Sequence, residues 1–303
     1  MITSKKINNK SIEIQTKFNN TKEIMTINAK LLALTFLIIS NLLFAQSSYI
    51  SINGGYGWAA SSGNIKGIEN ATYTSSSSTD LTPVNEEQIN LSFGQGTSFG
   101  LSAGYMYNAN IGAEIGISLL KGDNINSKST VAGNAFIINL NNDISAEMMR
   151  ISPSIIINAG MAQLNPYLKI GVIFGSGDIT KKTSVLEGTH SYETSYRFNG
   201  GWAIGTTANF GVLYTLEKDI SCFVELAMVN MSYAPTNGEL TAKVENGVSI
   251  LPSMTVNDRK IEYKDSYTSL GQNSSTSTPS VGLSQKFPFG SVGLNLGIKY
   301  NLQ

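Results

Sequence analysis

The stretch "SVGLNLGIKYNLQ", residues 291–303, alternates apolar and polar side chains with a period of two. Its apolar positions are Val292, Leu294, Leu296, Ile298, Tyr300 and Leu302, and glycine, amide or charged residues occupy the positions between them. Successive side chains of a β-strand point to opposite faces, so this pattern predicts a strand with one apolar and one polar face.

The same alternation recurs in seven earlier runs, at 49–58, 97–107, 110–119, 147–157, 166–175, 200–214 and 220–230. Short gaps of 2, 8 and 5 residues between runs alternate with long gaps at 59–96, 120–146, 176–199 and 231–290. An antiparallel up-and-down barrel with one short-turn rim and one long-loop rim produces this alternation. We therefore expect an all-β, eight-stranded antiparallel barrel with four long loops, the last of which is long enough to hold extra strands.

Two kinds of barrel fit an apolar strand face, because a soluble barrel turns that face inward and a membrane barrel turns it to lipid. Aromatic residues on this face collect at both ends of the strands. Five fall at the long-loop end (Tyr56, Trp58, Phe99, Phe174 and Trp202) and five toward the short-turn end (Tyr105, Tyr107, Phe210, Tyr214 and Tyr300). Two aromatic girdles are typical of the two lipid interfaces, so the pattern predicts a transmembrane β-barrel.

The opposite face carries glycine, serine, asparagine and five isolated charges, namely Glu114, Arg150, Lys169, Glu225 and Lys299. The interior of an eight-stranded barrel is just wide enough for side chains to fill, and unpaired charges there are costly. We expect a buried ion-pair network in the lumen. It forms either a sealed plug or a gated polar path, and the narrow lumen favours the plug.

An apolar run, "LLALTFLIISNLLFA" at 31–45, follows Lys30 and precedes a polar segment. This layout is typical of a secretory signal peptide, and the run is shorter than the roughly 20 residues of a membrane-spanning helix. We expect cleavage after Ala45, leaving 46–303 as the barrel. Residues 1–24 are polar and precede Met25, so the start codon lies at Met1 or at Met25.

Composition excludes several classes of function. The chain has 21 basic and 21 acidic residues and no basic cluster interleaved with aromatics, so no nucleic-acid partner is expected. No His, Cys or carboxylate cluster has the spacing of a metal site. Cys222 is the single cysteine, which excludes an intramolecular disulfide, and it shares the apolar parity of its strand.

Two further signals predict no chemistry. The glycine-rich segments 54–57 and 94–96 resemble phosphate-binding loops, but neither opens a helix after a strand. His190 and Ser191 lie together in a predicted loop, with nothing identifiable to orient the imidazole. We therefore expect no catalytic residues, no cofactor and no metal, and we expect that the protein is not an enzyme.

As a pattern over residues 46–303, the chain resembles the small outer-membrane β-barrel proteins, which include the OmpA-like and OmpX-like ones. The Ala45–Gln46 exit of the signal and the segment "FPFGSVGLNLGIKYNL" at 287–302 carry the resemblance. It implies location in the outer membrane, contact with its lipids, and recognition of the last strand by the barrel-assembly machinery. The family strand usually closes on an aromatic residue, whereas here Tyr300 is the last aromatic and the sequence ends Leu302-Gln303.

Members of that family share no single activity, so three classes of function remain. The first is a structural or surface-interaction protein, adhesin-like or antigenic, whose loops contact surface ligands. The second is a narrow channel or carrier for a small or apolar solute, resembling the OmpW-like barrels. The third is a lipid-modifying barrel enzyme.

Overall fold

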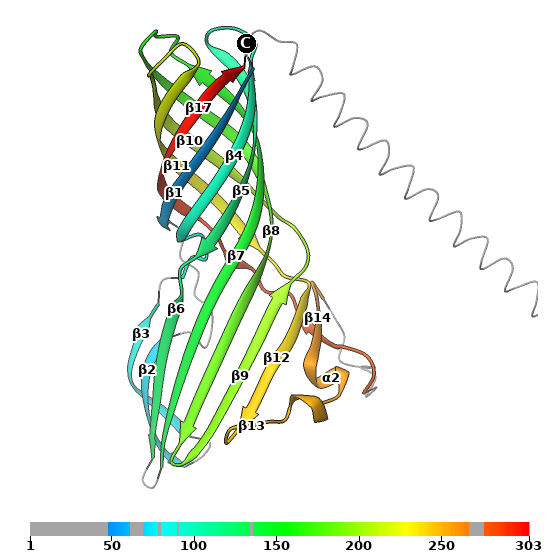
Figure 1. Cartoon of the computed structure of the whole chain (residues 1–303). Helices are drawn as coiled ribbons and strands as arrows, with labels where there is room; N and C mark the ends of the chain where they lie inside the picture. The colour runs from blue at the N-terminus through cyan, green and yellow to red at the C-terminus, as the bar shows by residue number, and fades with distance from the viewer. Residues whose placement is uncertain are drawn as a thin grey trace, which may run out of the picture. The chain divides into compact units, whose positions relative to one another are not determined.

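Eight strands pair edge to edge in a closed cycle, which we call the ring (Figure 1). In cyclic order they are β1 (Ser48–Ala59), β4 (Gly96–Met106), β5 (Ile111–Gly122), β7 (Ile137–Asn158), β8 (Leu164–Glu187), β10 (Ala203–Thr215), β11 (Ile220–Tyr233) and β17 (Ser291–Leu302). The pairings from β4 round to β17 are antiparallel, and β1 pairs with both β17 and β4. Each ring strand contains most or all of one period-two run of the sequence, but β7 and β8 extend well beyond their runs at 147–157 and 166–175.

The computed structural model describes residues 48–60, 69–77, 80–89, 91–133, 136–266 and 276–302, and Tyr49–Asn301 form one compact unit. The predicted signal peptide at 1–45 lies outside the described residues. No helix in the described ranges is long and apolar enough to cross a membrane.

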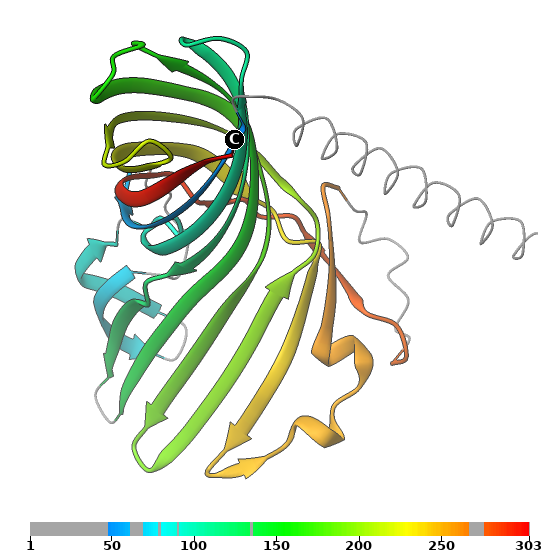
Figure 2. The same cartoon turned by 45° about the horizontal axis from the view of Figure 1, so that its top comes forward.

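Two ring strands, β7 and β8, are about twice as long as the others and continue beyond the ring, where they carry a second part of the sheet that we call the extension (Figure 1). Around them lie β6 (Ile125–Gly133), β9 (His190–Asn199) and β12 (Asn237–Glu245). Figure 2 shows these strands side by side below the ring. The extension is thus built on the same backbone as the ring.

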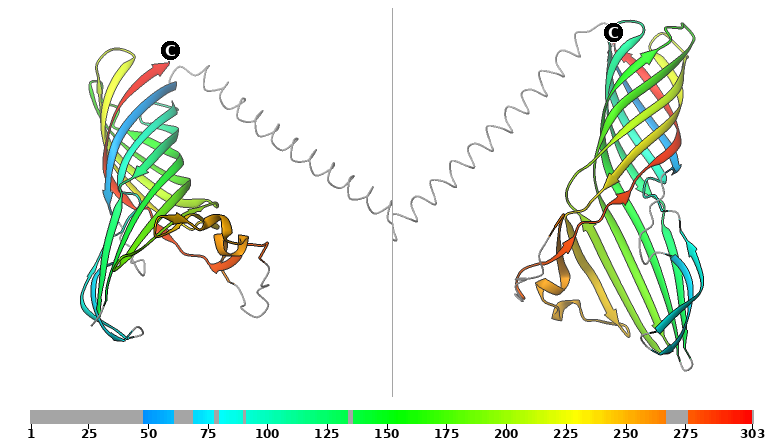
Figure 3. Two further views of the ribbon diagram at one scale, coloured as in Figure 1. Left: turned by 60° about the horizontal axis from the view of Figure 1, so that its bottom comes forward. Right: turned by 180° about the vertical axis from the view of Figure 1, so that it is seen from behind.

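Shorter elements complete the edges of the extension (Figure 3). They are β2 (Glu69–Ser77), β3 (Asp80–Gln88), β13 (Val248–Ser249), β14 (Lys260–Lys264), β15 (Ser280–Leu283), β16 (Phe287–Pro288), the 3-10 turn η1 (Leu251–Ser253) and the single-turn helix α2 (Val256–Arg259). Among the described pairings, β2 with β6 and β14 with β15 are parallel. The others with an assigned direction are antiparallel.

The all-β class and the mainly antiparallel pairing are confirmed, but the strand count and the four long loops are not. The described residues form a sheet of 17 strands rather than eight. Strands fill much of the predicted loops: β2 and β3 in 59–96, β6 in 120–146, β9 in 176–199, and β12 to β16 in 231–290. These segments are polar on both faces and so lack an apolar alternation, yet their Thr, Tyr and Val residues suit a pleated sheet once a partner strand is present.

The largest apolar core lies where the ring meets the extension. Its buried members are Leu91, Phe93, Leu120, Ile144, Ala146, Met148, Ile173, Ile179, Ala203, Met231, Tyr233 and Phe289. They come from β5, β7, β8, β10, β11 and the segments that precede β4 and β17. The hydroxyl of Tyr233 donates to the carbonyl oxygens of Gly177 and Gly200, so this core also joins β11 to β8 and to the turn after β9.

Replacing Ile144 by alanine tests this core. Ile144 is buried on β7, and removing its side chain leaves a cavity, so we expect a loss of about 2 to 5 kcal/mol in the free energy of unfolding. Ile137→Ala is the matched control, because Ile137 lies exposed on the same strand, and it should change stability by no more than about 0.5 kcal/mol. Denaturant titration of the folded protein measures both, and equal losses would contradict the core assignment.

Candidate functional site

The interior of the ring is the candidate site, because every predicted lumen charge lies there. Alternation along the strands places Glu114 on β5, Arg150 on β7, Lys169 on β8, Glu225 on β11 and Lys299 on β17 on the inward face. Arg150, Lys169, Glu225 and Lys299 are buried, and the side chain of Glu114 is only 8% exposed.

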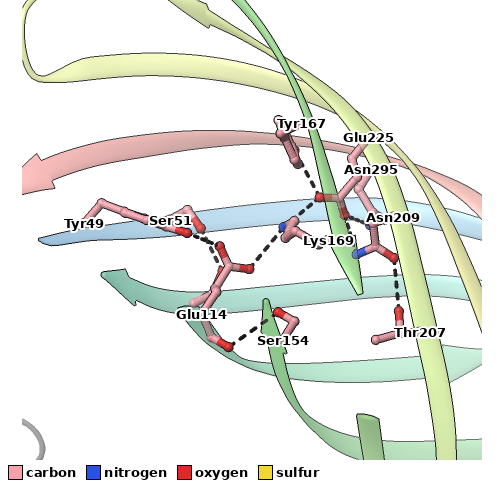
Figure 4. Close-up of polar contacts among 11 residues, drawn as sticks. Tyr49, Ser51, Glu114, Ser154, Tyr167, Lys169, Thr207, Asn209, Glu225 and Asn295 are labelled. Carbon is pink, nitrogen blue, oxygen red and sulfur yellow. Dashed lines mark hydrogen bonds and ion pairs between the residues drawn. The ribbon is translucent and has the colours of Figure 1, made fainter. Parts of the chain in front are cut away.

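Lys169 lies between the two carboxylates (Figure 4). Its Nζ is 3.1 Å from Glu114 Oε1 and 2.7 Å from Glu225 Oε2. The three residues come from β5, β8 and β11, which are not neighbours in the ring. The ion pairs therefore cross the lumen instead of following one pair of adjacent strands.

Hydrogen bonds satisfy the remaining carboxylate oxygens. Tyr49 Oη donates to Glu114 Oε2 over 2.8 Å, and Tyr167 Oη donates to Glu225 Oε2 over 3.0 Å. Asn209 Nδ2 and Asn295 Nδ2 both donate to Glu225 Oε1, over 3.0 and 3.2 Å. Each of the four oxygens thus has a donor, which is the condition under which buried ion pairs are tolerated.

Lys299 is buried but makes no ion pair among the described residues. Its Nζ lies 3.6 Å from the centroid of the Tyr49 ring, a cation–π contact. Tyr49 therefore connects the Lys299 ammonium group to the ion-pair network, because its ring contacts Lys299 and its hydroxyl donates to Glu114.

Aromatic rings close the lumen near the short-turn end. Tyr167 and Phe223 pack edge to face with their centroids 6.4 Å apart, and Ile156 is buried against them. The cavity beside this layer is only about 20 Å³.

Glycines on neighbouring strands make room for these rings. A Cβ at Gly104 would lie 2.2 Å from Tyr49 Cζ, and one at Gly211 would lie 2.3 Å from Tyr167 Cζ. A Cβ at Gly297 would likewise lie 2.3 Å from Phe223 Cζ. Strand glycines often mark such close approaches, and here they allow three large rings inside a narrow ring of strands.

Arg150 makes none of these ion pairs or hydrogen bonds, although it lines the same cavity as Glu114, Lys169 and Glu225. It is 7% exposed, and its Nε is buried without a hydrogen-bond partner. It lines a polar cavity of about 100 Å³ together with Ser98, Ser118 and Ser152. The structure thus brings Glu114, Lys169 and Glu225 together, places Lys299 beside them, and leaves Arg150 without a partner in the described part of the chain.

Side chains that the sequence analysis did not select are essential to this site. They are Tyr49, Tyr167, Phe223, Asn209 and Asn295, which surround the ion pairs. Parity alone could have found them, because Tyr49 shares the inward parity of Ser51, Tyr167 that of Lys169, and Phe223 that of Glu225. The predicted girdles account only for aromatic residues on the outward face.

The outward face of the ring is apolar and exposed. Its large exposed side chains include Ile50, Ile52, Leu101, Ile115, Ile117, Leu119, Ile155, Leu168, Ile170, Val172, Ile204, Val224, Leu226, Met228, Leu294, Leu296 and Ile298. Cys222 shares the outward parity of Val224 and Leu226. An apolar surface spread over all eight strands is far larger than the isolated patches of soluble proteins.

The predicted girdle aromatics also belong to this surface. Trp58, Phe99, Tyr107, Trp202, Phe210, Tyr214 and Tyr300 are exposed, whereas Tyr56, Tyr105 and Phe174 are partly buried. Tyr107 adjoins the turn between β4 and β5, and Tyr214 lies one residue before the end of β10. Tyr56 Oη donates to Asp123 Oδ2 at the opposite end of the ring.

Outside the ring, an exposed ion pair joins β8 to β9. Arg197 Nε lies 2.9 Å from Asp178 Oδ1, and this hydrogen bond lowers the pKa of the Asp178 carboxyl. Because both side chains are well exposed, the pair adds little to stability.

His190 and Ser191 begin β9, and their contacts are with Asn246. Asn246 Nδ2 lies 3.4 Å from His190 Nδ1, and the backbone N–H of Ser191 donates to Asn246 Oδ1. Within the described ranges, no group of three or more His, Cys, Asp or Glu side chains is placed to hold a metal ion.

Replacing Lys169 by methionine tests the ion-pair cluster. Two buried carboxylates would lose their shared cation, so we expect a loss of about 3 to 5 kcal/mol in the free energy of unfolding. Lys264→Met is the control, since Lys264 pairs with Glu262 on the surface and should contribute at most about 1 kcal/mol. Denaturant titration compares the two, and similar effects would show that the buried cluster contributes no more than a surface pair.

Comparison with known proteins adds the family. No curated protein matches the chain. A family model described as "Outer membrane protein beta-barrel domain" matches residues 29–220, which is more than half of the sequence and includes seven of the eight ring strands wholly or in part. The chain therefore belongs to the outer membrane β-barrel family.

Proposed function

We propose that the ring is an eight-stranded transmembrane barrel that anchors the protein in the outer membrane, with surface interaction as its task. The closed cycle of pairings leaves the ring without a free strand edge, which a structure in lipid requires. The ring strands other than β7 and β8 have 11 to 14 residues, close to the roughly 9 to 11 that a tilted strand needs to span a bilayer.

The outer face supports this anchor. Aliphatic side chains cover the middle of the ring strands, and exposed aromatic rings lie toward their ends. Amphipathic rings favour the headgroup level, so Trp58, Phe99 and Trp202 would lie at one interface and Tyr107, Tyr214 and Tyr300 at the other. Outer-membrane lipids are then the first partner, and the barrel-assembly machinery, acting on β17, is the partner during biogenesis.

The filled lumen favours an anchor over a channel. The Glu114–Lys169–Glu225 cluster crosses the interior, and Tyr167 and Phe223 close it toward the short turns. Such a layer excludes solutes larger than water unless side chains move. We therefore propose that the lumen is plugged, in preference to the alternative that it is a narrow channel or carrier for a small or apolar solute.

The single observation that carries the surface role is the extension. Strands β6 to β9 and β12 continue the sheet beyond the ring and line a hollow of about 780 Å³. Asn142 Nδ2 donates to Ser127 Oγ, and Thr183 Oγ1 donates to Asn142 Oδ1, on the sheet face opposite to the side chains of Asp143 and Lys182. Lysine and carboxylate side chains both line the hollow, which suits a hydrogen-bonding ligand without strong charge.

Orientation follows from the same geometry. The three short turns between ring strands lie at the end opposite the extension, as Figure 1 shows. Outer-membrane barrels have short periplasmic turns and longer extracellular segments. We therefore propose that the extension faces the outside of the cell, following export and cleavage of the signal peptide after Ala45.

Cysteine labelling on intact cells tests this orientation. In a Cys222→Ala background the chain has no cysteine, and Glu193→Cys then places one thiol on the hollow of the extension. A membrane-impermeant maleimide should label this variant in intact cells. The matched variant Lys218→Cys, exposed in the turn between β10 and β11, should be labelled only after the outer membrane is permeabilised. The reverse pattern would refute the proposed orientation.

Planar-bilayer recording tests the plug. We expect the purified protein to give no stable unitary conductance steps, because ion pairs and aromatic rings block the lumen. A heat-dependent shift in gel mobility first verifies that the inserted protein is folded. Stable steps that disappear in an Arg150→Gln variant would instead support the channel.

A further inference from the structure

Arg150 is a buried cation whose charge nothing in the described structure balances. It lies on β7 opposite Ser118 of β5 and Gly175 of β8, neither of which is acidic. The residue is 7% exposed, and its Nε has no hydrogen-bond partner. A buried guanidinium without a partner is strongly unfavourable, so a negative charge is needed near it.

The inward positions of the ring carry one more positive than negative charge. The cations are Arg150, Lys169 and Lys299, and the carboxylates are Glu114 and Glu225. Both carboxylates are engaged by Lys169 and by tyrosine and asparagine donors. Asp123, at the rim, accepts hydrogen bonds from Tyr56 and Gln95 instead. The chain itself therefore supplies no counter-ion to Arg150 among its described residues.

The cavity beside Arg150 has the size and the donors to hold a small anion. Its volume is about 100 Å³, and a cavity needs only about 10 to 15 Å³ by this measure to hold one water, so a small ion and several waters fit. Ser98, Ser118 and Ser152 contribute hydroxyl groups to its wall, and Asn53 contributes an amide. Glu114, Lys169 and Glu225 also line the cavity, and there the two carboxylates are already paired with Lys169. Gly94 and Gly96 also line it, which carries the cavity up to the rim of the ring.

We propose that this cavity binds a small monovalent inorganic anion of the size of chloride or bromide, with the Arg150 guanidinium as its main ligand. One negative charge balances the excess of the ring interior. A divalent phosphate or sulfate would reverse that excess, and the cavity offers it no second unpaired guanidinium. The anion completes the electrostatic balance of the lumen, independently of the surface role proposed above.

Thermal unfolding in detergent tests the site in the wild-type chain and in Arg150→Gln. The starting buffer contains sodium gluconate, a six-carbon anion much larger than a halide, and chloride or bromide replaces it stepwise at constant ionic strength. The wild-type unfolding temperature should rise with either halide and reach a plateau, because a ligand that binds only the folded state stabilises it saturably. Arg150→Gln should lose this response, and in gluconate alone it should be at least as stable as the wild type.

Arg197→Gln is the matched control, because it removes the same charge from an exposed pair in the extension. It should keep the full halide response of the wild type. A wild type without a saturable response, or an Arg150→Gln variant that keeps it, would overturn the proposal.

Bromide diffraction gives a second test that needs no variant. Crystals of the wild-type protein grown with sodium bromide should show an anomalous peak in contact with the Arg150 side chain. The absence of such a peak in a well-diffracting crystal would overturn the proposal even where Arg150→Gln fails to fold.

Discussion

The double ion pair of Lys169 is the interaction on which the interior of the ring depends. Its ammonium group joins Glu114 and Glu225, and so links three strands that share no backbone hydrogen bonds with one another. Backbone pairing fixes each strand only to its two neighbours. The cluster adds a restraint across the lumen, and the tyrosine and asparagine donors around it supply the hydrogen bonds without which two buried carboxylates would oppose folding.

The same narrow space explains why glycines and large rings alternate inside the ring. Tyr49, Tyr167 and Phe223 each lie over a glycine of a neighbouring strand, so a ring of eight strands holds aromatic groups that would otherwise collide with its wall. The outward face of the ring has the opposite character, because isoleucine or leucine side chains are exposed there on every strand. The two faces of this one sheet thus have opposite polarity, and the alternation of apolar and polar residues with a period of two supplies both faces.

That alternation made the ring predictable from sequence and left the extension unpredicted. Strands such as 291–302 carry apolar residues on one face only, and each of the eight runs lies mostly or wholly within one ring strand. In β9, "HSYETSYRFN", and in β6, "INSKSTVAG", neither face is consistently apolar, because only Phe198 and Ile125 at the ring end of these strands pack against the apolar core. Their strand character depends on pairing with β7, β8 and β12, which no local pattern encodes. Strand parity predicts which charged residues face inward. It does not predict their partners, because these depend on how far each side chain extends across the interior of the ring. Lys299 contacts the Tyr49 ring for this reason, and Arg150 contacts no carboxylate.

The continuity of β7 and β8 has a mechanical consequence. Both strands run from the short-turn end of the ring to the far end of the extension, hydrogen-bonded to each other along nearly their whole length. A pull on the extension along the strand direction would therefore move β7 and β8 together, and would load in shear, many at a time, the backbone hydrogen bonds that join them to β5 and β10. Tension applied to the extension would pass directly into the wall of the ring, with no flexible linker between them to yield first.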